Sequence, residues 1–140
     1  MNIRKFHYDA DLTQVQALWE SIEKGVSLGP SDSPEEIQKK LSRDPDLFLV
    51  AEEDGQIVGT VIGGFDGRRG LIYHLAVRTS FRGRGIGSRL MGEVESRLRA
   101  KGCIRCYLLV TTDNEDAMGY YQKLGWERMD YVVNFGKYLT

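Results

Sequence analysis

The spacing of apolar residues in the first third of the chain predicts one strand and two helices. Residues 3–6 fit a short first strand. Apolar residues then recur every three or four positions, which predicts a helix with one buried face: Leu12, Val15, Leu18, Trp19 and Ile22. A second helix is expected to begin at Ser33-Pro34-Glu35-Glu36, which combines a serine cap, proline at the first helical position and glutamate at the third.

Three apolar runs in the middle of the chain predict an antiparallel meander. The runs 47–51 and 57–62 flank a turn containing Asp54-Gly55, and Asp-Gly supplies the positive φ angles that a tight hairpin requires. A second turn bounded by glycines, 66–70, leads into a third strand over 71–77.

The pattern changes to alternating helices and strands in the last part of the chain. Helical spacing runs from Ile86 to Leu98, with Gly102 as a C-terminal stop. A buried strand is expected over 104–111, followed by a helix over 114–124 that Asn114 caps. A closing hairpin is expected from 126–129 paired with 132–139.

The predicted element order is β-α-α-β-β-β-α-β-α-β-β. A strand, helix and strand over 71–111 form a crossover that most simply makes two parallel neighbours. The sequence therefore predicts an α/β (α+β) fold with a mixed, mostly antiparallel sheet of six to seven strands flanked by about four helices. The length of 140 residues suits a single domain over 1–140.

Composition and charge exclude some partners and direct attention to the second half of the chain. The net charge of −1 gives no overall attraction to nucleic acid or to an anionic membrane. Residues 1–77 nevertheless carry 8 basic and 13 acidic side chains, and residues 78–140 carry 11 and 7. The C-terminal half is therefore the expected host for an anionic ligand. No apolar run suggests a signal peptide or a membrane span, so a cytoplasmic protein is expected.

The two cysteines, Cys103 and Cys106, form a Cys-x-x-Cys pair. Zinc normally requires four ligands, and the histidines lie far away in sequence. The pair also follows a predicted helix end, whereas a redox pair usually precedes a helix. We expect these cysteines to serve as small core residues and predict no metal site.

The segment Arg82-Gly83-Arg84-Gly85-Ile86-Gly87 carries the main chemical signal. It lies between a predicted strand and a predicted helix, where backbone N–H groups and the helix dipole favour an anion. No Gly-Lys-Ser/Thr follows, which excludes the P-loop pattern, and the glycine spacing differs from the dinucleotide-binding fingerprint. A tight turn that binds nothing is the remaining alternative for this segment taken alone.

Together with its neighbours, this segment resembles the GNAT N-acetyltransferase family across nearly the whole chain. The resemblance rests on Leu75-Ala76-Val77, Arg82-x-x-Gly85-x-Gly87, Asn114 and Ala117-x-x-Tyr120-Tyr121-x-x-Leu124-Gly125-Trp126. It implies acetyl-CoA as the co-substrate, with its pyrophosphate bound without a metal ion and its pantetheine paired to the strand at 71–77. The implied coenzyme contacts are Leu75, Ala76, Val77, Arg82, Gly83, Arg84, Gly85, Ile86, Gly87, Ser88, Asn114 and Tyr121.

The resemblance also implies acetyl transfer to an amine, with Tyr121 as proton donor to the departing sulfur and Tyr120 as a packing residue. Some members carry a glutamate early in the equivalent strand, where this chain has Leu71. The general base is therefore left open between His74, a relaying water and a carboxylate such as Glu52.

Two other functions remain open at this point. The chain could be a non-catalytic acyl-CoA binding module, because the strand glutamate is missing. It could also bind nucleic acid through the arginines of its second half, although no aromatic stacking platform accompanies them. The acidic N-terminal portion would suit a cationic amine or a peptide N-terminus as acceptor, and exposed closing strands leave a homodimer open.

Overall fold

The computed structural model describes residues 1–140 and contains one five-stranded sheet in the order β1-β2-β3-β4-β5. The first four strands are antiparallel neighbours, and β5 runs parallel to β4. The strand bounds are Asn2–Lys5 (β1), Phe48–Glu53 (β2), Gln56–Phe65 (β3), Gly70–Val77 (β4) and Cys106–Tyr107 (β5). The mixed α/β class predicted from the sequence is confirmed.

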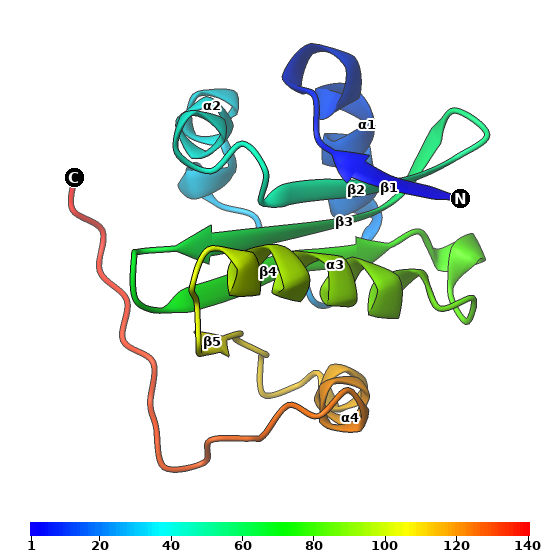
Figure 1. Ribbon diagram of the computed structural model, residues 1–140. Helices are drawn as coiled ribbons and strands as arrows, with labels where there is room; N and C mark the ends of the chain where they lie inside the picture. Colours follow the sequence, from blue (N-terminus) through cyan, green and yellow to red (C-terminus); the bar gives the residue numbers. More distant parts are fainter.

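Helices cover both faces of the sheet (Figure 1). On one face lie α1 (Tyr8–Ser21) and α2 (Pro34–Arg43), and on the opposite face lies α3 (Ile86–Ala100). The fourth helix, α4 (Glu115–Lys123), follows β5. Two short 3₁₀ turns, η1 (Pro30–Asp32) and η2 (Thr79–Phe81), precede α2 and α3 respectively.

Two apolar clusters, one on each face, hold the layers together. On the first face, Trp19 of α1 stacks on Phe48 of β2, and Ile37 of α2 belongs to the same cluster. Leu90 and Val94 of α3 belong to the cluster on the second face, with side chains of β2, β3 and β4. The packing of α3 on this second face therefore fixes the start of α3 relative to the end of β4. The candidate site lies between these two ends.

Helix caps form where the sequence predicts them. The Ser33 hydroxyl accepts a hydrogen bond from the Glu36 N–H at 3.3 Å, with Pro34 as the first helical residue. The Asn114 side chain accepts one from the Ala117 N–H at 3.2 Å and caps α4. Both caps satisfy N–H groups that a helix start otherwise leaves without partners.

The close approach of α3 to β3 depends on glycine at position 63. A Cβ added to Gly63 would lie 2.8 Å from Val94 Cγ2, too close for a stiff β-branched side chain to avoid. We expect Gly63→Ala to lower the free energy of unfolding by about 1–3 kcal/mol through overpacking. Urea denaturation followed by circular dichroism measures this.

The matched control for Gly63→Ala is Gly92→Ala, on the exposed side of α3, where an added Cβ meets nothing within 4 Å. Alanine favours a helix interior over glycine, so this change should raise stability by about 0.5–1 kcal/mol. A Gly63→Ala protein as stable as the Gly92→Ala protein would contradict the packing of α3 on β3.

The last part of the sheet differs from the sequence prediction. The strand expected over 104–111 is limited to Cys106–Tyr107, and Ile104 and Leu109 are exposed rather than buried. The hairpin expected from 126–129 and 132–139 is absent, so the sheet has five strands instead of six or seven.

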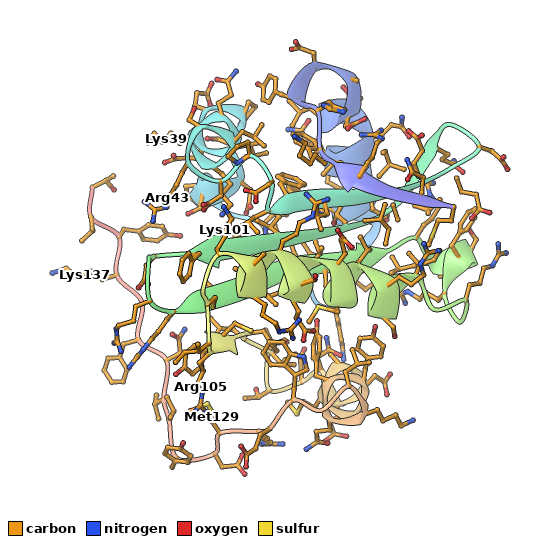
Figure 2. All side chains as sticks on the ribbon, in the orientation of Figure 1. Lys39, Arg43, Lys101, Arg105, Met129 and Lys137 are labelled. Atoms are coloured by element: carbon orange, nitrogen blue, oxygen red, sulfur yellow. The ribbon has the colours of Figure 1, made fainter.

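The chain after α4 continues to the C-terminus as an extended segment without joining the sheet (Figure 1). Its apolar side chains, such as Phe135 and Leu139, are exposed. One contact ties it to the sheet end, because Arg105 beside β5 approaches Met129 Sδ at 3.9 Å (Figure 2). The segment was predicted to form a closing hairpin, but it pairs with no strand.

None of the helices has the length and apolar character needed to cross a lipid bilayer.

Candidate active site

The edge of β4 that faces β5 is free over most of its length. β5 pairs with β4 only at Gly70 and Leu71. Beyond Leu71, residues 72–77 keep β3 on one edge and have no strand on the other. Unpaired N–H and C=O groups of a strand edge can accept an extended ligand as an added strand. This free edge includes the backbone of Leu75, Ala76 and Val77, the strand residues that the sequence assigns to the coenzyme.

A β-bulge interrupts the free part of β4. Thr60 lies opposite Ala76 and Ile62 opposite Tyr73, so two β4 residues, His74 and Leu75, oppose the single residue between them on β3. His74 has φ +52°, one of two non-glycine residues with positive φ in the chain. Bulges redirect side chains and are frequent beside active sites.

The glycine-rich segment forms an open turn at the start of α3. Gly83 and Gly85 both have φ +79°, and Gly85 is the N-cap residue of α3. No side chain caps this helix, and no acidic residue lies in its first turn. An ideal Cβ at Gly83 or Gly85 would meet no atom within 4 Å, so open space adjoins the N–H groups. This arrangement, here called the α3 cradle (residues 82–87), suits a phosphate group.

Two arginines of the α3 cradle carry no carboxylate partner. Arg82 Nε donates to the Val77 carbonyl at 3.4 Å, and the Arg84 guanidinium lies 4.7 Å above the Phe81 ring. Arg84 also donates a long hydrogen bond of 3.5 Å to the Ser80 carbonyl. Both side chains are exposed and neither is held by a short hydrogen bond, so they are free to turn towards an anion. Ile86, by contrast, is buried in the α3 cluster and can offer a ligand only its backbone.

The two tyrosines of α4 make different contacts. Tyr120, predicted to pack, places its hydroxyl 3.2 Å from Ser88 Oγ, and a Cβ on Gly87 would lie 2.7 Å from that hydroxyl. Tyr121 instead packs beside the α3 cluster, with its ring centroid 6.3 Å from that of Trp126. A side chain at position 87 would therefore displace the Tyr120 hydroxyl.

Burial raises the pKa of Tyr121 to about 12, with a smaller contribution from Tyr120. A phenol with this pKa stays protonated across the neutral range, so it can donate a hydrogen bond but cannot serve as a base.

Asn114 lies at the base of α4 and is nearly buried. Its Oδ1 is already used in capping the helix, and Gly25 approaches its Nδ2 from the loop after α1. The structure thus gives Asn114 a local structural role, and only its Nδ2 remains to contact a coenzyme.

His74 lies on the α1 face of the sheet and has a partner that the sequence did not reveal. Its Nε2 is 2.6 Å from Oδ1 of Asp32, which belongs to the η1 turn between α1 and α2. Its ring makes an edge contact with Trp19 at 4.9 Å between centroids. Forty-two residues separate His74 from Asp32, and Ser-Asp-Ser beside a proline looks like an ordinary loop, so no local signal pointed to the pair.

The other carboxylate considered as a base, Glu52, is engaged elsewhere. Its Oε2 accepts a hydrogen bond from Arg4 at 2.7 Å, and Arg4 also binds Asp11 of α1. Glu52 lies on β2, separated from β4 by β3. This location places it away from the free edge of β4.

His74 and Tyr121 therefore approach the sheet from opposite faces. Tyr121 packs with the α3 cluster, whereas His74 contacts α1 and the η1 turn. The sheet therefore separates the imidazole of His74 from the phenol of Tyr121.

The cysteines form no part of this arrangement. Cys103 packs in the α3 cluster, and burial raises the pKa of the Cys106 thiol to about 11. No group of three or more His, Cys, Asp or Glu side chains is placed to hold a metal ion.

Comparison with known proteins gives consistent results. The family model described as "Acetyltransferase (GNAT) family" matches residues 13–126. A Pectobacterium atrosepticum protein named as an acetyltransferase is 46% identical over 140 residues, covering 99% of this chain and 96% of that protein. Glucosamine-6-phosphate N-acetyltransferase from Arabidopsis thaliana has a TM-score of 0.74 at 20% identity, covering 99% and 98% of the two chains. A Mycobacterium tuberculosis protein crystallised with CoA has a TM-score of 0.74 at 18% identity, covering 93% and 74%.

Proposed function

Because the chain belongs to the acetyltransferase (GNAT) family, we propose that it transfers the acetyl group of acetyl-CoA to a primary amine of a small molecule, peptide or protein. The observation that carries this proposal is the free edge of β4 ending at the α3 cradle. The two features are continuous, since Val77 ends β4 and residues 82–87 form the cradle after one 3₁₀ turn.

The residues present fit a coenzyme A molecule. Open space at Gly83 and Gly85 leaves the N–H groups of the α3 cradle accessible to a pyrophosphate, and Arg82 and Arg84 supply positive charge. The backbone groups that residues 75–77 direct away from β3 match the amides of a pantetheine arm. The positive net charge of residues 78–140 favours the same polyanion.

When bound, acetyl-CoA would supply an activated thioester carbonyl: a C–N bond forms to the amine as the C–S bond breaks. The backbone N–H groups near Val77 would polarise the carbonyl oxygen. His74 would accept the proton lost by the amine, and Tyr121 would donate one to the departing sulfur. Proton exchange through solvent would then restore both side chains, so the net products are an acetamide and a free thiol.

The acceptor would approach from the face of α1, α2 and the η1 turn, where His74 and Asp32 lie. The N-terminal half of the chain, which builds this face, carries a net negative charge. A cationic amine or a peptide N-terminus is the acceptor class that this charge favours.

We expect the purified protein to release free CoA thiol from acetyl-CoA only when a suitable amine is present. A thiol-release assay against a panel of small amines, peptide N-termini and lysine peptides measures this, with mass spectrometry to identify the acetylated product. Binding of acetyl-CoA without acetylation of any acceptor in the panel would instead support a non-catalytic acyl-CoA binding module.

A further inference from the structure

We infer that Asp32 is a positioning residue that holds the His74 imidazole in one tautomer, with Nε2 protonated and Nδ1 free to accept a proton. This inference rests on the proposed function for its catalytic meaning. Its structural part, the choice of tautomer, can be tested without any reaction.

The contact between the two side chains is short and sheltered. His74 Nε2 lies 2.6 Å from Asp32 Oδ1, and the two side chains are 12% and 17% exposed. A carboxylate at neutral pH can only accept hydrogen bonds, so the nitrogen facing it must carry a proton. In a neutral imidazole the other nitrogen, Nδ1, is then the acceptor.

Nδ1 has no hydrogen-bond partner and keeps some exposure to solvent. The structure contains no hydrogen bond to this atom, and Arg78 Nε is the sole buried side-chain nitrogen or oxygen that lacks one. Nδ1 is therefore not sealed inside the core.

Both partners of the pair are fixed by their surroundings. Asp32 also accepts a hydrogen bond through Oδ2 from the Gly29 N–H at 3.0 Å, which anchors it in the η1 turn. On β4, the His74 carbonyl accepts from the Thr60 hydroxyl at 3.0 Å, and Thr60 in turn accepts from Trp19 Nε1 at 2.9 Å. The bulge thus holds the imidazole between Trp19 and Asp32.

Of the groups that contact the imidazole, Asp32 is the one that carries a charge. Tyr73, the neighbouring residue, makes an edge contact at 5.3 Å between centroids, and Trp19 and Thr60 carry no charge. Burial raises the pKa of Tyr73 to about 12, with smaller effects from Asp32 and Asp44, so it is neutral. The arrangement of carboxylate, imidazole and open nitrogen is the one that orients a general base in other enzymes.

The first test uses nitrogen-15 NMR to read the tautomer of each histidine in the protein without ligand. The chain has two histidines, so His7, at the start of α1, serves as an internal reference. We expect Nε2–H as the dominant form of neutral His74, and a mixture of both forms in Asp32→Ala. If His74 showed the same tautomer populations in the wild type as in Asp32→Ala, the inference would be overturned, whether or not the protein has activity.

The second test measures kinetics. We expect Asp32→Asn to lower kcat about tenfold to hundredfold with little change in the KM for acetyl-CoA, since Asn preserves the hydrogen bond to Gly29 but removes the charge. Glu127→Gln, an exposed charge in the segment after α4 and away from the proposed acceptor face, is the control and should behave as the wild type. A rise in KM for acetyl-CoA with unchanged kcat would assign Asp32 to folding of the turn instead.

The third test probes His74 itself. Glycine suits the φ of +52° at this position, so His74→Gly should fold while vacating the imidazole site. We expect kcat to fall about hundredfold and added imidazole to restore part of it, with no such rescue in Tyr121→Phe. If the wild type were active and His74→Gly turned over at the same rate, His74 would be excluded as the base. The acetyltransferase function would be unaffected by that result.

Discussion

Tyr121→Phe is expected to lower kcat by about 10²- to 10³-fold while coenzyme A binds with an affinity within about threefold of the wild type. The change removes only the hydroxyl, and the ring that packs beside Trp126 remains. Because the pKa of Tyr121 is about 12, the wild-type phenol stays protonated below about pH 11. Deprotonation of Tyr121 should therefore not lower the wild-type rate at any pH below that value.

The neighbouring change, Tyr120→Phe, is the matched control for the proton donor. It removes the hydroxyl that forms a hydrogen bond with Ser88 Oγ on α3. Like Tyr121→Phe, it changes a residue of α4 and removes a single oxygen. We expect its effect on kcat to be less than about tenfold, because a hydroxyl bond at an exposed site is worth about 1 kcal/mol. If Tyr120→Phe lost activity and Tyr121→Phe kept it, Tyr120 would be the donor.

Gly85→Val is expected to weaken coenzyme A binding by about hundredfold or more. Valine at φ +79° is strained, and its branched side chain would occupy the open space beside the N–H groups. Loss of two charge-assisted hydrogen bonds costs about 3 kcal/mol, which corresponds to roughly hundredfold in affinity. Isothermal titration calorimetry with coenzyme A measures the change.

Gly67→Val separates the loss of the cradle from backbone strain. Gly67 also has positive φ, +103°, and its Cβ would meet nothing within 4 Å, but it lies in the β3–β4 turn away from the α3 cradle. We expect Gly67→Val to lose stability while keeping the wild-type affinity for coenzyme A. Equal losses of affinity in both variants would contradict a specific role for Gly85.

Elements with strong local signals were predictable from the sequence. The Asp54-Gly55 turn adopts the positive φ angles that the hairpin prediction requires, 52° and 77°. Ser33 and Asn114 cap the helices that they were predicted to start. In each case the determining interaction joins residues within four positions of one another, so the sequence contains it directly.

Elements whose stability depends on a distant partner were not predictable in the same way. Residues 104–111 were predicted to be a buried strand and 132–139 part of a closing hairpin, but a run of apolar residues does not say which strand would pair with it, and Leu109 and Phe135 are exposed. The bulge at His74 depends on the register of β3 against β4, and its contact with Asp32 joins residues 42 positions apart. The resemblance to the family identified the α3 cradle, whereas the partner of the candidate base required the three-dimensional structure.

The central claim is that backbone N–H groups at the start of α3 bind the diphosphate of acetyl-CoA. Amide NMR spectra of the nitrogen-15-labelled protein, recorded with coenzyme A and with pantetheine, test it most directly. The claim predicts large shifts of the Gly83, Gly85 and Gly87 amides with coenzyme A and small ones with pantetheine, which lacks the diphosphate. Unchanged glycine amides in the presence of saturating coenzyme A would contradict it.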